Sequence, residues 1–287
     1  LGVISSAKNE MISPEEFLLS AKADGDSRLQ RIGELYMEYQ KRLKKNNALD
    51  FDDLLVKTVE LFQAKQEVLE YYQDRFRYIM VDEYQDTNTV QFKLVSLLAA
   101  KYRNICVVGD DDQSIYRFRG AKPEIMLGFE KDFPGTKRVL LGTNYRSTKE
   151  IVETSLRLIE HNKVRFEKKL EPFRGSGRPV DFRVFDNPGH EMDTVAQSIR
   201  AYHDAGYQWS EIAVLFRTGA NSGLMAERLM GYNIPFKLRD VIPNLYSHWI
   251  AKDLFAYMEI APVTDHISVI SVLRQGAKLS RVIHKPP

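Results

Sequence analysis

The sequence has a single cysteine, almost no net charge and no long apolar run, and each scarcity excludes a class of protein. Cys106 cannot form an internal disulfide, which favours a reducing, intracellular setting. No apolar run approaches the roughly 18 residues that a membrane span needs. The formal net charge is only +2 over 287 residues, so any contact with nucleic acid must use local patches.

A phosphate-binding loop, GxxxxGK followed by Ser or Thr, is also absent from the sequence. The nearest stretch, residues 134–137, reads PGTK, and no glycine stands five positions before Gly135. Without such a loop there are no cradling backbone N–H groups, no lysine for the β- and γ-phosphates and no hydroxyl for Mg²⁺. We therefore expect the chain by itself to bind ATP poorly and to turn over little or none.

Hydrophobic residues make up 44% of the sequence, which is enough for a buried core. In the first fifty residues, apolar side chains recur at helical spacing between 27 and 45. Ser13 followed by Pro14 is typical of a helix start, with serine as the N-cap and proline in the first turn. These patterns predict a small helical region over residues 1–50.

From residue 51 onward, short apolar runs that end in polar clusters alternate with stretches of helical spacing. Strands are predicted at 78–81, 105–108, 139–141, 180–185 and 212–216, and helices near 88–101, 147–162, 190–205 and 220–230. This alternation predicts an α/β fold with a mostly parallel sheet. Ligands of such sheets bind beyond the carboxyl ends of the strands, so the polar residues there are the candidate site.

Two carboxylates, Asp82 and Glu83, directly follow the predicted strand 78–81. Because successive residues at a strand end point to different sides, the two can take different roles. The pattern has the form of a Walker B element, in which Asp82 would hold Mg²⁺ and Glu83 would orient and deprotonate an attacking water. A solvated strand end explains the pair as well, since short motifs recur by chance.

The predicted strand 105–108 is followed by a polar stretch in which aromatic residues alternate with arginines, including Tyr116, Phe118 and Arg119. Rings that stack on bases and guanidinium groups that pair with phosphates suit single-stranded nucleic acid. An ordinary core aromatic cluster with solvated arginines is the alternative, and the pattern alone favours it.

A further aromatic and arginine pair, Tyr145 and Arg146, follows the predicted strand 139–141. The ring can stack on a base while the cation pairs with a phosphate. A helix capped by Ser147, preceded by an incidental Tyr-Arg, explains the same residues.

Basic residues are frequent between 163 and 183 and form a candidate phosphate-tracking patch. Three acids, Glu167, Glu171 and Asp181, are mixed among them and favour an ordinary solvated surface. The basic residues are Lys163, Arg165, Lys168, Lys169, Arg174, Arg178 and Arg183.

Three of these segments resemble motifs II, III and IV of the UvrD/Rep/PcrA family of DNA helicases. They read DEYQD at 82–86, GDDDQSIYRFRGA at 109–121 and GTNYRST at 142–148. The resemblance implies that Gln113 senses the γ-phosphate of ATP and that Tyr145 stacks on its adenine. It also implies that Arg146 reaches the γ-phosphate as an arginine finger.

By the same resemblance, Tyr116 and Phe118 contact the DNA strand, and Arg119 helps to couple the two sites. Phe118 departs from the family, which usually has Trp there, and we expect weaker base stacking because Phe offers less surface. Thr143 is a second departure, from the usual Gln or Glu. Residues 50–55, DFDDLL, match another family element, although a capped helix start explains their acids equally well.

The resemblance covers nearly the whole chain in the family's order and implies partial RecA-like parallel-sheet motor domains with a helical insertion. We expect truncation on both sides. The implied domains are the helical insert of the first motor domain (1–50), the C-terminal part of that domain (51–143), the N-terminal part of the second motor domain (144–262) and the start of a second helical insert (263–287).

The implied parent protein is a bacterial, cytoplasmic DNA helicase that hydrolyses ATP with Mg²⁺ to move along single-stranded DNA and unwind duplex. Its partners would be single-stranded and partially duplex DNA, and repair or replication proteins. One alternative is a catalytically degenerate module that binds single-stranded DNA, if the phosphate-binding loop is absent from the gene. A second is a metal-dependent nuclease that uses Asp82, Glu83, Asp86 and residues 110–112.

Overall fold

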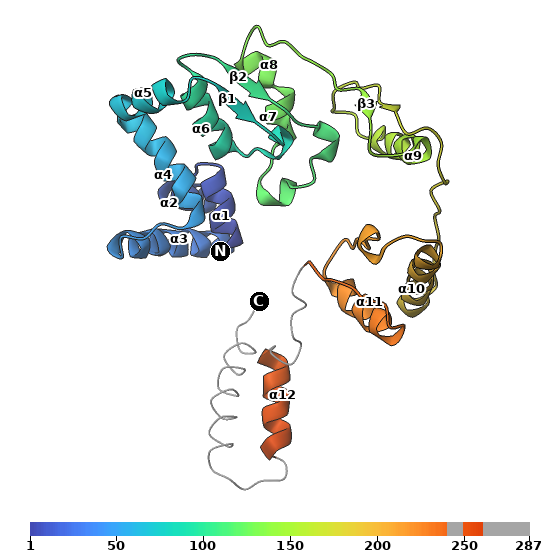
Figure 1. Ribbon diagram of the computed structural model, residues 1–287. Coiled ribbons are helices and arrows are strands. Elements are labelled where there is room, and N and C mark those ends of the chain that lie inside the picture. The colour runs from blue at the N-terminus through green and yellow to red at the C-terminus, as the bar shows by residue number, and fades with distance from the viewer. Residues whose placement is uncertain (240–248, 261–287) are drawn as a thin grey trace. The chain divides into compact units, whose positions relative to one another are not determined.

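The computed structural model describes residues 1–239 and 249–260 (Figure 1). The chain divides into two compact units, Leu1–Asp181 and Phe182–Pro287. None of the helices in the described ranges combines the length and the apolarity of a membrane span. The predicted start of a second helical insert, at 263–287, lies outside the described residues.

The first unit begins with the predicted helical region, which consists of α1 (Gly2–Asn9), α2 (Pro14–Ala23) and α3 (Ser27–Lys45). The predicted helix start at Ser13 is confirmed, because its side chain caps α2 and Glu16 completes a reciprocal capping box. A small core of Ile4, Ala7 and Tyr36 packs α1 against α3. The predicted helix at 27–45 is confirmed by α3.

A buried lysine joins α1 to α4 (Phe51–Ala64). The Lys8 side chain is 1% exposed, and its Nζ lies 2.6 Å from Asp50 Oδ2 and 2.9 Å from Asp53 Oδ1. Asp50 and Asp53 also form the capping box at the start of α4, so the alternative of a capped helix start holds for residues 50–55. The same two carboxylates therefore cap one helix and neutralise the lysine of another.

The predicted site residues Asp82, Glu83 and Gln113 follow the two strands of a short parallel sheet. After α4 come α5 (Gln66–Arg75), β1 (Ile79–Val81), α6 (Thr89–Ala99) and β2 (Ile105–Val107). β1 and β2 pair in parallel, with Met80 opposite Cys106, which confirms the strands predicted at 78–81 and 105–108. Because the strands are parallel, both carboxyl ends meet at one edge, where the Tyr84 N–H donates to the Val108 carbonyl oxygen at 3.0 Å.

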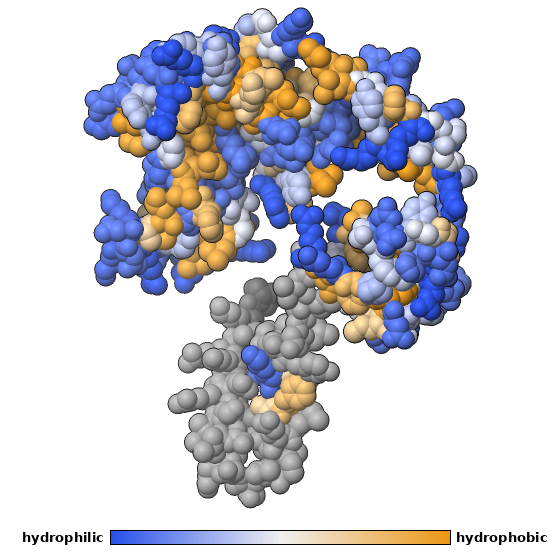
Figure 2. Space-filling model, viewed as in Figure 1, coloured by the Kyte–Doolittle hydropathy of each residue, from blue (hydrophilic) through white to orange (hydrophobic). Residues whose placement is uncertain are grey.

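The two faces of this sheet differ. On one face, the flanking residues of both strands pack on a core that contains Tyr84 and Phe129, together with residues of α7 (Pro123–Leu127) and α8 (Phe129–Asp132). On the other face, Met80 is 83% exposed and Cys106 is exposed beside it. Figure 2 shows apolar side chains at the surface around these strands. Parallel sheets are usually covered on both faces, and the described residues cover only one.

A second small sheet follows in the same unit. β3 (Thr143–Asn144) pairs in parallel with β4 (Glu171–Pro172), and α9 (Lys149–Ile159) lies between them in the sequence. The strand predicted at 139–141 was wrong: Val139 and Leu141 are 70% and 77% exposed, and the strand begins two residues later. A strand needs a partner for its ladder, and β4 lies opposite residues 143–144 rather than 139–141.

The second unit is helical in its described part. α10 (Pro188–Asp204) packs on α11 (Ala220–Gly231) through a core that includes Met192, Ala196, Met225 and Leu229, and α12 (Trp249–Ile260) follows. The helices predicted near 88–101, 147–162, 190–205 and 220–230 are thus all confirmed.

The strands predicted at 180–185 and 212–216 were wrong, because neither segment has a ladder partner among the described residues. Ile212, Val214 and Phe216 nevertheless pack on the core of α10 and α11. The alternating pattern therefore identified the buried face of the segment without identifying a strand. The helix-rich structure with its small parallel sheets remains compatible with the predicted α/β class.

Replacing Lys8 with methionine should lower the free energy of unfolding by about 3–5 kcal/mol, because Asp53 would stay buried without its cation. Chemical denaturation followed by circular dichroism measures the loss. The control is Lys57→Met, which removes a half-exposed pair with Glu60 and should cost less than about 1 kcal/mol. Similar losses in the two variants would contradict the special role of the buried pair.

Candidate functional site

Asp82 and Glu83 lie where β1 ends, and the backbone turns sharply between them and the next residues. Glu83 has φ 51° and ψ 39°, a left-handed conformation that costs a residue with a side chain about 1–2 kcal/mol. Its N–H donates to Asp82 Oδ1 at 2.9 Å. Both side chains are exposed, so both carboxylates can reach a ligand at the sheet edge.

A buried amide, Gln85, connects this turn to the end of β2. Gln85 is only 1% exposed. Its Nε2 donates to Glu83 Oε2 at 2.8 Å, and its Oε1 accepts from the Asp110 N–H at 3.0 Å. A Cβ on Gly109 would lie 2.6 Å from Gln85 Oε1, which explains why glycine stands at that position. The sequence motif contained Gln85, but nothing in the pattern indicated that its side chain would be buried.

Gln113 belongs to the same hydrogen-bonded system. It lies in the short helix η2 (Asp111–Gln113), and its Nε2 donates to Asp110 Oδ2 at 2.7 Å. Asp110 thus accepts from Gln113 with its side chain and donates to Gln85 with its backbone. The structure therefore brings together Glu83 and Gln113, which the sequence placed in two separate motifs.

Three consecutive aspartates, 110–112, are bound by the loop after α9. Arg165 forms a bidentate pair with Asp112, with Nε–Oδ1 at 2.8 Å and Nη2–Oδ2 at 2.5 Å. Lys168 contacts all three aspartates, and its side chain is only 8% exposed. For Arg165 and Lys168, the predicted phosphate-tracking patch and the alternative of a solvated surface are both wrong, because carboxylates bind both cations.

These contacts shift the pKa of the groups involved. Burial acts to raise the pKa of the Asp112 carboxyl, but hydrogen bonds from Arg165 and then Lys168 outweigh it and lower the pKa below its ordinary value. The pKa of Asp110 is lowered in the same way, against burial, by Lys168 and Gln113. Within the part of the chain that the structure describes, no group of three or more His, Cys, Asp or Glu side chains is arranged to hold a metal ion.

The three residues predicted to contact DNA form one exposed cluster. The Tyr116 and Phe118 rings have centroids 5.8 Å apart, and Phe118 is 73% exposed. The Arg119 guanidinium lies 5.2 Å from the Tyr116 centroid and 5.6 Å from that of Phe118. Two exposed rings beside a cation fit the predicted stacking surface better than a core cluster, because a core cluster would be buried.

Tyr145 and Arg146 lie in the turn after β3, and both are exposed. Asn144 Oδ1 accepts from the Arg146 N–H at 3.0 Å, which shapes the turn. The Tyr145 ring contacts Phe173, with centroids 5.1 Å apart, and Arg174 Nη1 donates to the Arg146 carbonyl oxygen at 2.9 Å. No hydrogen bond, ion pair or ring contact among the described residues joins this turn to Glu83 or Gln113.

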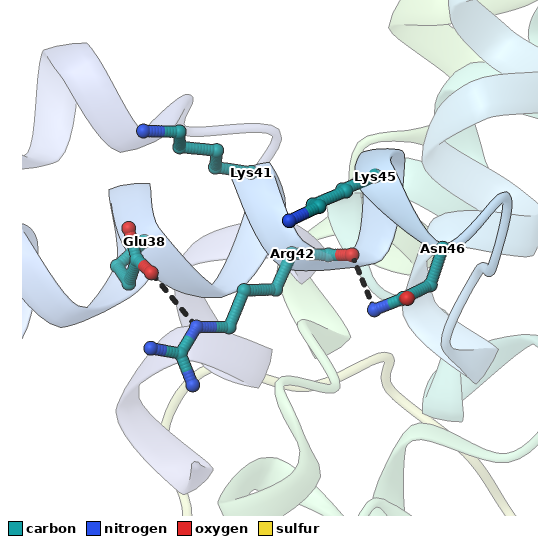
Figure 3. Close-up of a pocket in the computed structure, with 5 residues that line it drawn as sticks. All are labelled: Glu38, Lys41, Arg42, Lys45 and Asn46. Carbon is teal, nitrogen blue, oxygen red and sulfur yellow. Dashed lines mark hydrogen bonds and ion pairs between the residues drawn. The ribbon is translucent and has the colours of Figure 1, made fainter.

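An open groove on α3 lies apart from all of these residues in the sequence. It is lined by Glu38, Lys41, Arg42, Lys45 and Asn46 (Figure 3). Arg42 Nε donates to Glu38 Oε1 at 2.7 Å, and the Arg42 carbonyl oxygen accepts from Asn46 at 2.9 Å. None of its lining residues belongs to the predicted site.

Comparison with known protein families finds one match for the first half of the chain and another for the second half. Residues 1–134 match the UvrD/REP helicase N-terminal domain, and residues 139–282 match the UvrD-like helicase C-terminal domain. The chain belongs to the UvrD-like helicase family. The resemblance found in the three motifs is thereby confirmed.

The UvrD-like chain is similar over almost its whole length to curated bacterial proteins named ATP-dependent DNA helicase PcrA. The protein of Staphylococcus epidermidis is 41% identical over 286 residues, which cover 98% of this chain and 39% of the relative. The Bacillus subtilis protein is 43% identical over 281 residues, which cover 96% of this chain and 38% of the relative. This UvrD-like chain therefore spans about two fifths of the length of these relatives.

The lowered pKa values of Asp110 and Asp112 predict how stability depends on pH. A carboxyl whose pKa is lower in the folded chain stabilises the fold above its unfolded pKa of about 3.9 and loses that contribution as pH falls further. In urea unfolding, the difference between wild type and Arg165→Met should be constant above about pH 5 and shrink below about pH 4. A difference that vanished near pH 6 would contradict its assignment to these carboxylates.

Proposed function

We propose that this chain is the part of an ATP-dependent DNA helicase that carries the ATP-hydrolysing carboxylates, on partial RecA-like motor domains. The observation that carries the proposal is the hydrogen-bonded series from Glu83 through Gln85 and Asp110 to Gln113. It links the predicted base to the predicted γ-phosphate sensor at one sheet edge, where α/β proteins bind ligands. Membership of the UvrD-like family and the names of the relatives support the same function.

In this proposal each site residue has one role. Glu83 accepts the proton of the attacking water, with its carboxylate held by Gln85. Gln113 and Arg146 contact the γ-phosphate, and Tyr145 stacks on the adenine. Asp82 is exposed at the strand end, which fits a Mg²⁺ that keeps most of its waters and takes phosphate oxygens. Bound Mg²⁺ would neutralise charge on the phosphates.

The DNA strand contacts the cluster of Tyr116, Phe118 and Arg119 in this proposal. Stacking on exposed rings tolerates every base, as a protein that moves along DNA requires. The domain limits that follow from the family's order are 1–50, 51–143, 144–262 and 263–287, as the sequence predicted. We also propose that the protein acts in the bacterial cytoplasm on single-stranded and partially duplex DNA.

The nuclease alternative needs free carboxylates at 110–112, and these are engaged by Arg165 and Lys168. This observation favours the helicase over the nuclease. A degenerate DNA-binding module would keep the aromatic cluster and lose hydrolysis, so the next experiment separates it from an active motor.

In the full-length protein, Glu83→Gln should reduce ATP hydrolysis stimulated by single-stranded DNA by roughly 10²–10⁴-fold, because the positioned base is removed. A coupled assay of phosphate release measures the rate. The control is Glu67→Gln, in the first turn of α5, which should leave the rate unchanged. An inactive wild type would indicate the degenerate module, and an active Glu83→Gln variant would mean that another group is the base.

Phe118→Ala should weaken the binding of single-stranded DNA by about 1–3 kcal/mol, the value of one stacked base. Phe118→Trp should strengthen binding, because indole offers more stacking surface. Fluorescence anisotropy with a labelled oligothymidine measures both in the full-length protein. The matched control, Phe182→Ala, removes an exposed ring outside the cluster, and an equal loss there would argue against specific stacking.

A further inference from the structure

The loop after α9 contacts all three residues of the aspartate segment 110–112. Arg165 binds Asp112 with two hydrogen bonds, the Phe166 N–H donates to Asp111 Oδ2 at 2.8 Å, and Lys168 reaches all three aspartates. These contacts tie residues 110–112 to the loop, whereas the short helix η2 by itself is a single turn.

Lys168 is also one contact away from the predicted sensor of ATP. Its Nζ lies 2.5 Å from Asp110 Oδ1, and the other oxygen of the same carboxylate accepts from Gln113 Nε2 at 2.7 Å. A carboxylate that is bound at both oxygens has one orientation. The exposed Gln113 side chain is therefore held in place by a group that is itself held by a nearly buried lysine.

The charges explain why this arrangement depends on Lys168. Three carboxylates on successive residues repel one another, and Arg165 is paired with Asp112 alone. Without Lys168, Asp110 would face two neighbouring negative charges with no cation of its own, so its carboxylate would turn toward water. Gln113 would then lose its fixed partner.

We propose that Lys168 is a positioning residue for ATP hydrolysis, which acts through Asp110 to orient the carboxamide of Gln113. The proposal rests on the proposed function, in which Gln113 contacts the γ-phosphate. It deepens that function, because Lys168 lies beyond residue 143 and hence in the segment assigned to the second motor domain. In this proposal, Lys168 of the second motor domain fixes the side-chain geometry of Gln113 in the first motor domain.

The test compares Lys168→Met, Gln113→Ala and the double variant in the full-length protein, with kcat and KM for ATP measured under saturating single-stranded DNA. Lys168→Met should lower kcat by roughly 10- to 100-fold, because the sensor is misplaced, and change KM by less than about threefold. The double variant should be no slower than Gln113→Ala, because Lys168 has nothing left to position. The adjacent Lys169, 87% exposed and paired with Glu171, supplies the control Lys169→Met, which should match wild type.

A second variant tests whether Lys168→Met acts only by destabilising the fold. Lys168→Met combined with Asp111→Asn removes one cation and one anion, so the net charge of the cluster is unchanged while Asp110 still lacks its lysine. Its thermal unfolding midpoint should lie closer to that of wild type than the midpoint of Lys168→Met, and its kcat should be lowered to the same extent. Recovery of kcat in this variant would mean that Lys168 acts only through stability, and would overturn the proposal.

The same three variants distinguish a failure of the positioning role of Lys168 from a failure of the proposed helicase function. If Gln113→Ala is slow and Lys168→Met slows it further by its full single-variant factor, the positioning role is wrong while the helicase function stands. If wild type shows no stimulated hydrolysis, or Gln113→Ala is fully active, the assigned role of Gln113 fails and the role of Lys168 fails with it.

Discussion

A buried amide must satisfy its hydrogen-bonding groups inside the protein, and Gln85 does so between the ends of two parallel strands. Its two ends differ, one donating and the other accepting, so it can join a carboxylate to a backbone N–H in one orientation only. The position of Glu83 relative to Asp110 follows from this constraint. Gly109 makes the approach sterically feasible, and the rest of the site extends from Asp110.

Two lysines for which the sequence predicts no carboxylate partner turn out to be nearly buried. Lys8 binds two capping aspartates of α4, and Lys168 binds three aspartates after β2. Burial of a charge is tolerated only where opposite charges surround it, and the carboxylates came from segments about 40–60 residues away in both cases. No local pattern can predict such pairs, because they depend on which loops meet in space.

Much of the fold could be predicted because its signals are local. Helix starts at Ser13 and Asp50 follow from capping chemistry, and the edge of β1 and β2 follows from apolar runs that end in acids. The segments at 139–141, 180–185 and 212–216 misled because alternation reports which side chains become buried, whereas a strand requires a neighbour. For the site, motifs supplied Glu83 and Gln113 but not the Gln85 and Asp110 contacts between them, since side-chain partners are set by tertiary packing.

Glu83 shows how function and folding compete at one backbone position. Its left-handed conformation suits glycine, which has no side chain to clash, and relief of this backbone strain would by itself favour the folded chain by about 1 kcal/mol. Glycine, however, has no carboxylate for Gln85 to bind. The sharp turn directs the Glu83 carboxylate away from the axis of β1. The backbone strain of this conformation is present whenever the chain is folded. Stability at this position therefore reflects two opposing contributions, the backbone strain of Glu83 and the hydrogen bond that its carboxylate accepts from the buried Gln85 amide.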